Sequence, residues 1–175
     1  MAANSDKKPN RSGFSLIELI ITIAVMGIVV TIATLNFNIW QKKSRMDAQT
    51  REIFTDLNEA RTNAVTQKIY YGIIFQPNSY VIKSYDSATV PTAATAASTG
   101  TTAMTKNLLF GINKAGDVFD NTPVLFDTTG MTIDMCTIFV APLDPDKDEA
   151  TVNCITISAA RVNMGKINGT ACEFK

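Results

Sequence analysis

The sequence predicts an α+β protein, with one long N-terminal α-helix packed on an antiparallel β-sheet domain. Residues 14–33 form an apolar run that contains one charge, Glu18, and no proline. Residues 34–66 also lack proline and repeat apolar side chains at helical spacing. From Ile69 onward the period shortens, and short apolar segments alternate with turn-forming residues. The chain therefore divides into residues 1–13, a helix over residues 14–67, and a β-rich domain over residues 68–175.

The composition argues against catalysis and against a basic nucleic-acid platform. The 175 residues include no histidine, which removes the commonest general base and metal ligand. The sequence has no Ser/Lys or Cys/His set and no phosphate-cradling glycine loop. The formal net charge is zero, and the β-rich part holds more acids than bases. We expect no enzyme activity, cofactor or metal.

Residues 14–33 are long enough to cross a membrane. Twenty helical residues cover roughly 30 Å, the thickness of the hydrocarbon layer of a bilayer. Lys7, Lys8 and Arg11 precede this run, and positive charge there keeps that end cytoplasmic. Glu18 lies near the N-terminal end of the run, where burial of a carboxylate in lipid costs about 2.5–3.5 kcal/mol. An acid placed at that cost usually has a partner.

The stretch Gly13-Phe14-Ser15-Leu16-Ile17-Glu18-Leu19 resembles the prepilin peptidase site of type IV pilins and type II secretion pseudopilins. The resemblance implies a type IV pilin-like fold and cleavage after Gly13, so that residues 1–13 are a leader. It also implies N-methylation of Phe14 and storage in the bacterial inner membrane with the β-rich domain in the periplasm. The implied partners are the prepilin peptidase and other pilins or pseudopilins of a filament.

Glu18 is the candidate assembly residue. In a bundle of apolar helices, the free N-terminal amine of a neighbouring subunit carries a positive charge that Glu18 can neutralise. A buried pair of this kind is a good device for fixing the register between subunits. The alternative is an acid that reaches the lipid headgroups and has no role in assembly.

The helix is expected to continue past the membrane to about Gln67. Its second half has one apolar face, as a helix packed on a domain should have. Trp40 lies just past the apolar run, where interfacial aromatics are common. Many major pilins carry a proline in the middle of this helix. Here Gly27 occupies that region and no proline is present.

A strand, a turn and a second strand are predicted between Ile69 and Tyr85, around Pro77-Asn78-Ser79. This hairpin and the helix end before it resemble GspH/FimT-like minor pseudopilins and minor pilins, in which an Arg-x-x-Ala element ends the helix. Arg61 and Ala64 match that element. Two further matches to the subgroup are Phe126 with Gly130, and Arg161-Val162-Asn163, the latter with a departure because Ala160 replaces a glycine. The resemblance suggests a minor subunit.

Two segments are predicted to be exposed loops. Residues 87–105 are a low-complexity run of Ala, Thr and Ser that cannot build a core, so we expect a flexible loop. Residues 144–149 alternate acids as a calcium loop does, but they lack the glycine and the final glutamate of an EF-hand. A solvated hairpin tip is favoured there over a calcium site. The segments around this tip, residues 131–140 and 151–158, are expected to be paired strands, and residues 162–167 are expected to close the sheet.

Cys136, Cys154 and Cys172 are disulfide candidates if the domain lies outside the cytoplasm. Pairing of the two strands about a centre near Pro145 would place Cys136 opposite Cys154, and we favour that bridge. A bridge between Cys154 and Cys172 is the alternative, and it would pin the C-terminal end of the chain.

The favoured function is that of a structural subunit, a minor pilin or pseudopilin, in a type IV pilus or a type II secretion pseudopilus. The alternative is a minor pilin that captures DNA for uptake, as some FimT-like relatives do through basic residues near the C-terminus. In this sequence Arg161 and Lys166 are the main candidates for such contacts, together with Lys175.

Overall fold

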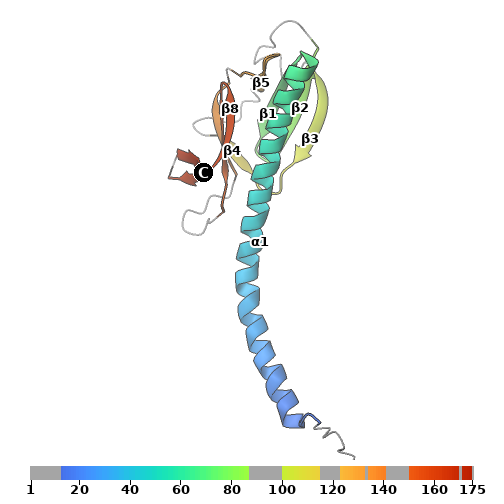
Figure 1. Ribbon diagram of the computed structural model, residues 1–175, viewed down its shortest axis with the longest axis vertical. Coiled ribbons are helices and arrows are strands. Elements are labelled where there is room, and N and C mark those ends of the chain that lie inside the picture. Colours follow the sequence, from blue (N-terminus) through green and yellow to red (C-terminus); the bar gives the residue numbers. More distant parts are fainter. Residues whose placement is uncertain are drawn as a thin grey trace, which may run out of the picture. The chain divides into compact units, whose positions relative to one another are not determined.

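The structure is a computed structural model that describes residues 13–86, 100–114, 123–132, 134–140, 150–169 and 171–174, without the side chains of residues 33–36. It divides into two units, Met1–Trp40 and Gln41–Lys175. The α-helix α1 (Leu16–Gln67) runs through both units (Figure 1). The predicted helix over residues 14–67 is thus correct to within two residues at its start.

Local interactions explain where α1 begins and ends. The carbonyl oxygen of Ser15 accepts the first helical hydrogen bond from the Leu19 amide at 3.2 Å, as expected of an N-cap residue. No proline interrupts the following 52 residues. Lys68 directly follows the helix with a φ of 59°, the left-handed conformation that commonly closes a helix.

The second half of α1 presents one buried face to the sheets. The buried positions recur every three or four residues, as an amphipathic helix requires: Met46, Gln49, Thr50, Ile53, Asp56, Leu57, Ala60 and Ala64. Its apolar members form one core with residues from both sheets, including Ile73, Phe126, Ile138 and Ile155. Burial of this face is the main stabilising term for the domain.

The strands form two antiparallel sheets behind this helix face. The first sheet has the order β3-β2-β1-β5, with β1 (Tyr70–Gln76), β2 (Ser79–Tyr85), β3 (Thr101–Asn107) and β5 (Val124–Phe126). The second has the order β4-β6-β7-β8-β9, with β4 (Ile112–Lys114), β6 (Cys136–Val140), β7 (Cys154–Ser158), β8 (Arg161–Asn168) and β9 (Ala171–Phe174). The predicted fold class, one long helix on antiparallel sheet, is confirmed.

Residues 101–105 are not part of a loop, as the sequence analysis expected, but belong to strand β3. All of their side chains are exposed, so no apolar alternation marks the strand. Backbone pairing with β2 holds it instead, from Ser79 with Asn107 to Ser84 with Thr101. Gly100, at a φ of +88°, lies against the Tyr85 ring where only a residue without a Cβ fits, and the strand begins directly after it. Residues 87–99 lie outside the described part of the chain.

The favoured disulfide Cys136–Cys154 is wrong, and the alternative, Cys154–Cys172, is present. Strands β6 and β7 pair Cys154 with Phe139 and Cys136 with Ile157. Cys136 is thus three positions away from the residue opposite Cys154, and an odd offset places it on the other face of the sheet. There it packs against the apolar core, while the disulfide lies on the opposite face.

The sheet does not end at Ile167, as expected from the sequence, because a further strand follows β8. Strand β9 pairs with β8, and the disulfide joins β9 to β7 across it. Strands two places apart in a flat sheet lie about 9.6 Å apart, yet the Cα atoms of Cys154 and Cys172 are 6.0 Å apart. The sheet therefore bends at Gly165, which pairs with both Cys154 and Phe174. A Cβ at Gly165 would lie 2.2 Å from the Glu173 carbonyl oxygen, so the bend depends on glycine.

Candidate functional site

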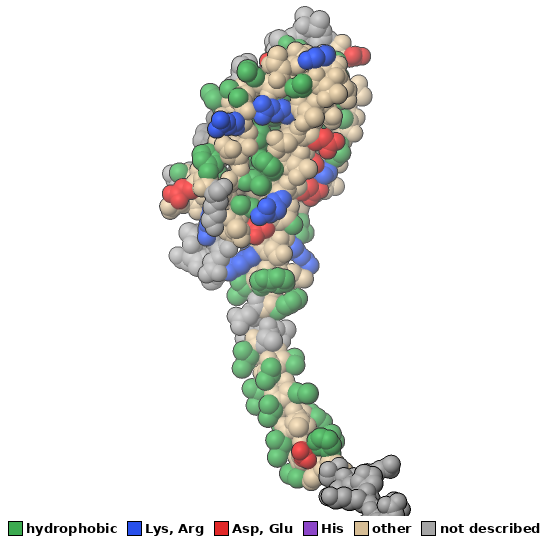
Figure 2. Space-filling view, in the orientation of Figure 1, with side chains coloured by type: hydrophobic (Ala, Val, Ile, Leu, Met, Phe, Trp, Pro, Cys, Tyr) green, Lys and Arg blue, Asp and Glu red, His purple; other side chains and the backbone are tan. Residues whose placement is uncertain are grey.

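The candidate site is the apolar first part of α1, which lies within the N-terminal unit. Every large apolar side chain from Phe14 to Ile32 is more than half exposed, from 53% at Ile20 to 83% at Phe14. Figure 2 shows hydrophobic side chains covering this part of the helix. By length and composition, α1 is the one helix of the described residues that could cross a membrane, with a mean hydropathy of 2.6 in its most apolar window. Water is a poor environment for such a surface, and lipid or other apolar helices would cover it.

The two threonine hydroxyls of this segment are satisfied within the helix. The hydroxyl of Thr22 donates to the Leu19 carbonyl oxygen at 2.8 Å, and that of Thr31 donates to the Gly27 carbonyl oxygen at 2.8 Å. Such bonds within one turn allow hydroxyls to enter an apolar environment at low cost. Glu18 is then the one charged side chain between Phe14 and Ile32, and it lies in the first turn of α1. The free amide groups at a helix N-terminus favour a carboxylate at that place.

The predicted processing residues precede the helix. Gly13, Phe14 and Ser15 are not helical, and no atom lies within 4 Å of the position that a Cβ of Gly13 would take. The backbone between Gly13 and Phe14 is thus open to a protease in the described chain. The roles of Gly13, Phe14 and Glu18 in processing and assembly stay predictions.

A buried polar cluster ties the helix to the first sheet in the domain unit. The Tyr80 hydroxyl donates to Asp56 Oδ2, and the Lys106 ammonium lies 2.8 Å from the same oxygen and 2.8 Å from Glu52 Oε1. Asp56 is 5% exposed and Tyr80 is 1% exposed. The cluster joins α1 to β2 and to the edge strand β3, whose other side chains contribute little burial. It therefore fixes the position of β3 on the domain.

The titration of this cluster follows from its burial and its charges. Burial, followed by the hydrogen bond to Asp56, raises the pKa of Tyr80 far above its ordinary value. Burial alone would lower the pKa of Lys106, but its bonds to Asp56 and Glu52 outweigh that effect and raise it. The tyrosine is thus a hydrogen-bond donor and the lysine a cation throughout the physiological range.

This cluster was not predicted from the sequence, although the sequence contains a signal for it. Asp56 lies on the buried stripe of the helix between Ile53, Leu57 and Ala60, where an apolar residue is expected. An acid at such a position requires a cationic or hydrogen-bonding partner. The sequence does not say which residue this is, because Tyr80 and Lys106 are 24 and 50 positions away.

Two of the motif elements that suggested a minor subunit, the one at Arg61 and the one that ends at Gly130, meet in the domain. Gly130 has a φ of +79°, and a Cβ there would lie 2.8 Å from Val65 Cγ2 and 3.2 Å from Arg61 Nε. The turn before it is organised by Asp127, whose Oδ1 accepts hydrogen bonds from Thr129 and from the Met131 amide. Burial opposes ionisation of Asp127, but these bonds prevail and lower its pKa. The Arg-x-x-Ala element and the turn thus form one contact at the end of α1.

Other polar side chains of α1 anchor loops of the domain. The Gln49 amide nitrogen donates to the Phe110 carbonyl oxygen at 2.7 Å, and its oxygen accepts from the Phe110 amide at 2.8 Å. Asp47 accepts from the Val152 amide at 2.9 Å. The apolar stretch around Phe110 is therefore a connection between β3 and β4 that the Gln49 side chain holds in place.

The basic candidates for DNA contacts do not form a patch. Arg161 and Lys166 are both on β8, but their spacing of five places them on opposite faces of the sheet. Glu173 lies opposite Lys166 on β9 and accepts a hydrogen bond from Asn168 at 2.7 Å. Lys175 lies outside the described residues.

For metals, the part of the chain that the structure describes holds no group of three or more acidic or cysteine side chains able to bind an ion. The acidic segment 144–149 lies outside that part, so the preference for a hairpin tip over a calcium site stays a prediction.

Comparison with known proteins gives two findings. Residues 8–34 match the model of the prokaryotic N-terminal methylation motif. The structure is similar to the crystal structure of the type IV minor pilin FimU of Pseudomonas aeruginosa, with a TM-score of 0.50 and 13% sequence identity over 77% of this chain and 96% of that one. No curated protein sequence matches the chain. The comparisons therefore show an N-terminal methylation motif and a fold like that of a type IV minor pilin.

Proposed function

We propose that this type IV pilin-like protein is a minor subunit of a bacterial filament, either a type IV pilus or a type II secretion pseudopilus. It is made with a leader, residues 1–13, which prepilin peptidase removes after Gly13. Before assembly, the apolar segment holds the subunit in the inner membrane with the domain in the periplasm. On assembly, the same segment leaves the lipid and joins the helices of neighbouring subunits.

The exposure of the apolar segment carries this proposal. The domain buries its apolar residues in one core, whereas the segment from Phe14 to Ile32 buries none of its large side chains. Full burial of one such side chain contributes about 1.5–3 kcal/mol, so a helix of this kind gains strongly from any apolar surroundings. Lipid and a bundle of apolar helices are both apolar surroundings of this kind, so the segment can be transferred from one to the other.

Glu18 supplies the specificity that apolar contact lacks. Removal of the leader creates a new amine at Phe14, four residues before Glu18. In a bundle of staggered subunits, a charged amine of one chain and the Glu18 carboxylate of another can meet only at defined offsets. A buried charge without its partner costs several kcal/mol, so wrong registers are excluded.

The minor role is supported by the contact at the end of α1. Arg61, Ala64 and Gly130 match the GspH/FimT-like pattern, and Gly130 lies directly against Arg61 and Val65. A minor subunit predicts a specific phenotype: loss of the gene should reduce the number of filaments while leaving the bulk of each filament unchanged. Electron microscopy and quantitative mass spectrometry of sheared filaments measure both quantities.

Processing is tested by the intact mass of the protein from its native host. The mass should correspond to a chain that begins at Phe14 and carries one added methyl group. A chain that keeps residues 1–13 in a host with active prepilin peptidase would contradict the proposal.

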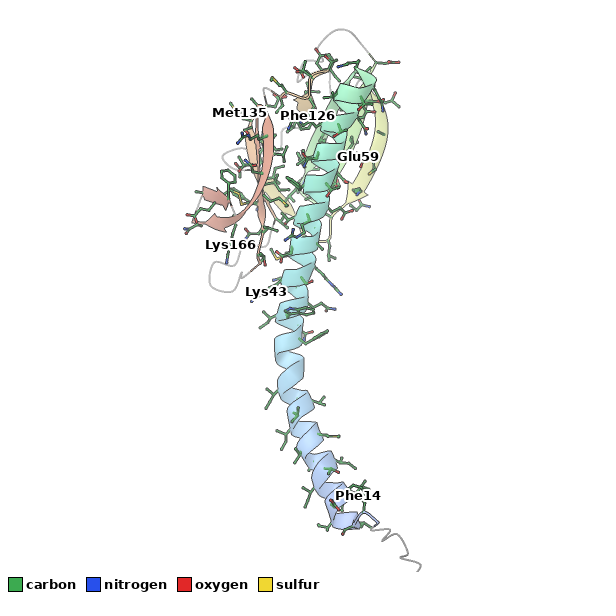
Figure 3. All side chains as sticks on the ribbon, in the orientation of Figure 1. Phe14, Lys43, Glu59, Phe126, Met135 and Lys166 are labelled. Carbon is green, nitrogen blue, oxygen red and sulfur yellow. A yellow bond between two sulfur atoms is a disulfide. The ribbon has the colours of Figure 1, made fainter. Side chains whose placement is uncertain are left out.

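Assembly is tested by Glu18→Gln, with Glu59→Gln as the matched control. Glu59 is an exposed glutamate on the domain half of the same helix, labelled in Figure 3. Glu18→Gln should be processed and inserted normally, yet be absent from filaments, because the amide cannot neutralise the amine. Glu59→Gln should assemble as the wild type does. Normal incorporation of the Glu18→Gln variant would refute the register argument.

A further inference from the structure

We infer that Asn168 is a site of spontaneous deamidation, and that Glu173 delays this reaction while the β8–β9 hairpin is intact. Asn168 ends strand β8 and is followed by Gly169, and no other asparagine of the sequence is followed by glycine. Both residues are exposed. The product carries a carboxylate in place of the amide, which loosens strand β9. This inference concerns the domain alone and does not rest on the proposed filament role.

The reaction requires the backbone nitrogen of the next residue to reach the asparagine side chain. The Gly169 nitrogen attacks Asn168 Cγ, so that a new C–N bond forms and the bond from Cγ to Nδ2 breaks. The proton of the attacking N–H passes through water to Nδ2, which leaves as ammonia. Water then opens the five-membered imide at either of its carbonyl groups and gives aspartate or isoaspartate.

Gly169 leaves its own backbone nitrogen unshielded. It has no side chain, its φ is +63°, and no atom of the described residues lies within 4 Å of the position that a Cβ would take. Asn168 lines a surface hollow together with four other residues of the two strands, so water also reaches its amide: Lys166, Ile167, Glu173 and Phe174. The site therefore has both reactants of the two steps, an accessible backbone nitrogen and water.

Glu173 holds the amide of Asn168 in the folded hairpin. Asn168 Nδ2 donates a hydrogen bond to Glu173 Oε1 at 2.7 Å. Bonds to a carboxylate are stronger than bonds between neutral groups, so this one restrains the rotation of the amide that ring closure needs. It also raises the electron density of the amide, which makes Cγ a weaker electrophile. Loss of this bond should therefore accelerate deamidation.

Deamidation replaces this attraction with repulsion. At neutral pH a carboxylate at position 168 has no hydrogen to donate, and it lies beside the carboxylate of Glu173. Figure 3 labels Lys166, which pairs with Glu173 across the two strands and offsets part of the added charge without restoring the bond. Strand β9 has little other support from its side chains, because three of the four are exposed. It should then separate from β8 at the turn, while the disulfide at Cys172 keeps it attached.

Peptide mapping of the full chain in detergent tests the site. After incubation at mildly alkaline pH and reduction of the disulfide, trypsin releases residues 167–175, which contain Asn168, and residues 162–166, which contain Asn163 followed by methionine. Chromatography and mass spectrometry then measure the amide, aspartate and isoaspartate forms of each peptide, with a sample taken before incubation as background. Conversion should occur in the first peptide and not in the second.

The role of Glu173 is tested by Glu173→Ala, with Phe174→Ala as the matched control. Both variants remove an exposed side chain of β9, but only the first removes the bond to Asn168. Deamidation should be roughly threefold faster in Glu173→Ala than in the wild type and unchanged in Phe174→Ala. No conversion at Asn168, equal rates in Glu173→Ala and the wild type, or equal acceleration in both variants would overturn the inference.

The effect on β9 is tested by hydrogen exchange of its amides. Exchange should be roughly threefold faster in Asn168→Asp, and in wild type that incubation has already deamidated, which needs no substitution. Adding Glu173→Gln to Asn168→Asp supplies a donor that faces the new carboxylate, so the double variant should return to the rate of the untreated wild type. Unchanged exchange after deamidation, or no recovery in the double variant, would overturn the proposed loosening by charge repulsion.

Discussion

Removal of the Cys154–Cys172 disulfide by Cys172→Ala should destabilise the domain by about 3 kcal/mol. The two cysteines are 18 residues apart, and closing a loop of that length in the unfolded chain has about this entropic effect. Packing cannot compensate for the loss, because Ala171, Glu173 and Phe174 of β9 are exposed. Strand β9 should therefore separate from β8 before the rest of the domain unfolds.

The assay is urea unfolding of the full chain in detergent, followed by circular dichroism of the β-sheet signal. With a slope of about 2 kcal/mol per molar urea, the midpoint should fall by roughly 1.5 M. A reducing agent should produce a similar shift in the wild type and little change in Cys172→Ala. Hydrogen exchange should show faster exchange at the β8 amides that pair with β9.

Cys136→Ala is the control, since Cys136 packs against the core and takes no part in the disulfide. It should keep the response to reducing agent. The reasoning would be refuted if Cys172→Ala unfolded at the wild-type midpoint, or if the reducing agent destabilised Cys172→Ala as strongly as the wild type.

Three further changes test other contacts by the same unfolding assay. Gly165→Ala should cost about 1–3 kcal/mol or more, since its Cβ meets the Glu173 backbone, and an unchanged midpoint would contradict the bend at this position. Tyr80→Phe should cost about 1–3 kcal/mol, because buried Asp56 loses a donor; a neutral result would mean that Lys106 alone satisfies that carboxylate. Asp127→Asn tests the pH dependence of stability. Because the pKa of Asp127 is lowered in the folded state, its carboxylate stabilises the domain above about pH 4, and this stabilisation is lost as the pH falls further. The free energy of unfolding of the wild type should therefore exceed that of the variant by about 1 kcal/mol at pH 6 and by less at pH 3. An equal difference at both values would show that the charge of Asp127 is unimportant.

The long helix could be predicted because its signals are local. Absence of proline over residues 14–66 and the repeat of Ile53, Leu57, Ala60 and Ala64 need no knowledge of distant residues. The hairpin of β1 and β2 was predictable for the same reason, since the Pro77-Asn78 turn joins two apolar segments. The structure places these elements within two residues of the expected bounds.

Strands β3 and β9 could not be predicted because pairing, and not their own side chains, holds them. Thr101–Asn107 exposes nearly all of its side chains and depends on β2 for its backbone bonds. Strand β9 depends on β8 and on the disulfide. An Ala- and Thr-rich composition indicates only that the side chains of a segment do not contribute to the core of the domain. This is true of an exposed edge strand as well as of a loop.

The disulfide was mispredicted because register cannot be read from spacing alone. A change of three positions in the pairing of β6 and β7 moves Cys136 from one face to the other. The buried cluster around Asp56 shows the same limit: its acid was visible on the apolar stripe, but its partners come from strands far along the chain. In both cases tertiary arrangement, and not local pattern, decides the contact.

The placement of the three cysteines on two faces has a consequence for the order of oxidation during biogenesis. Cys136 and Cys154 are made before Cys172, so an oxidant meets this pair first. Once β6 and β7 have paired, their thiols point to opposite sides of the sheet and cannot be joined without undoing the hairpin. Cys154 therefore stays available for Cys172, and their bond can form only after β9, the last strand among the described residues, has been made.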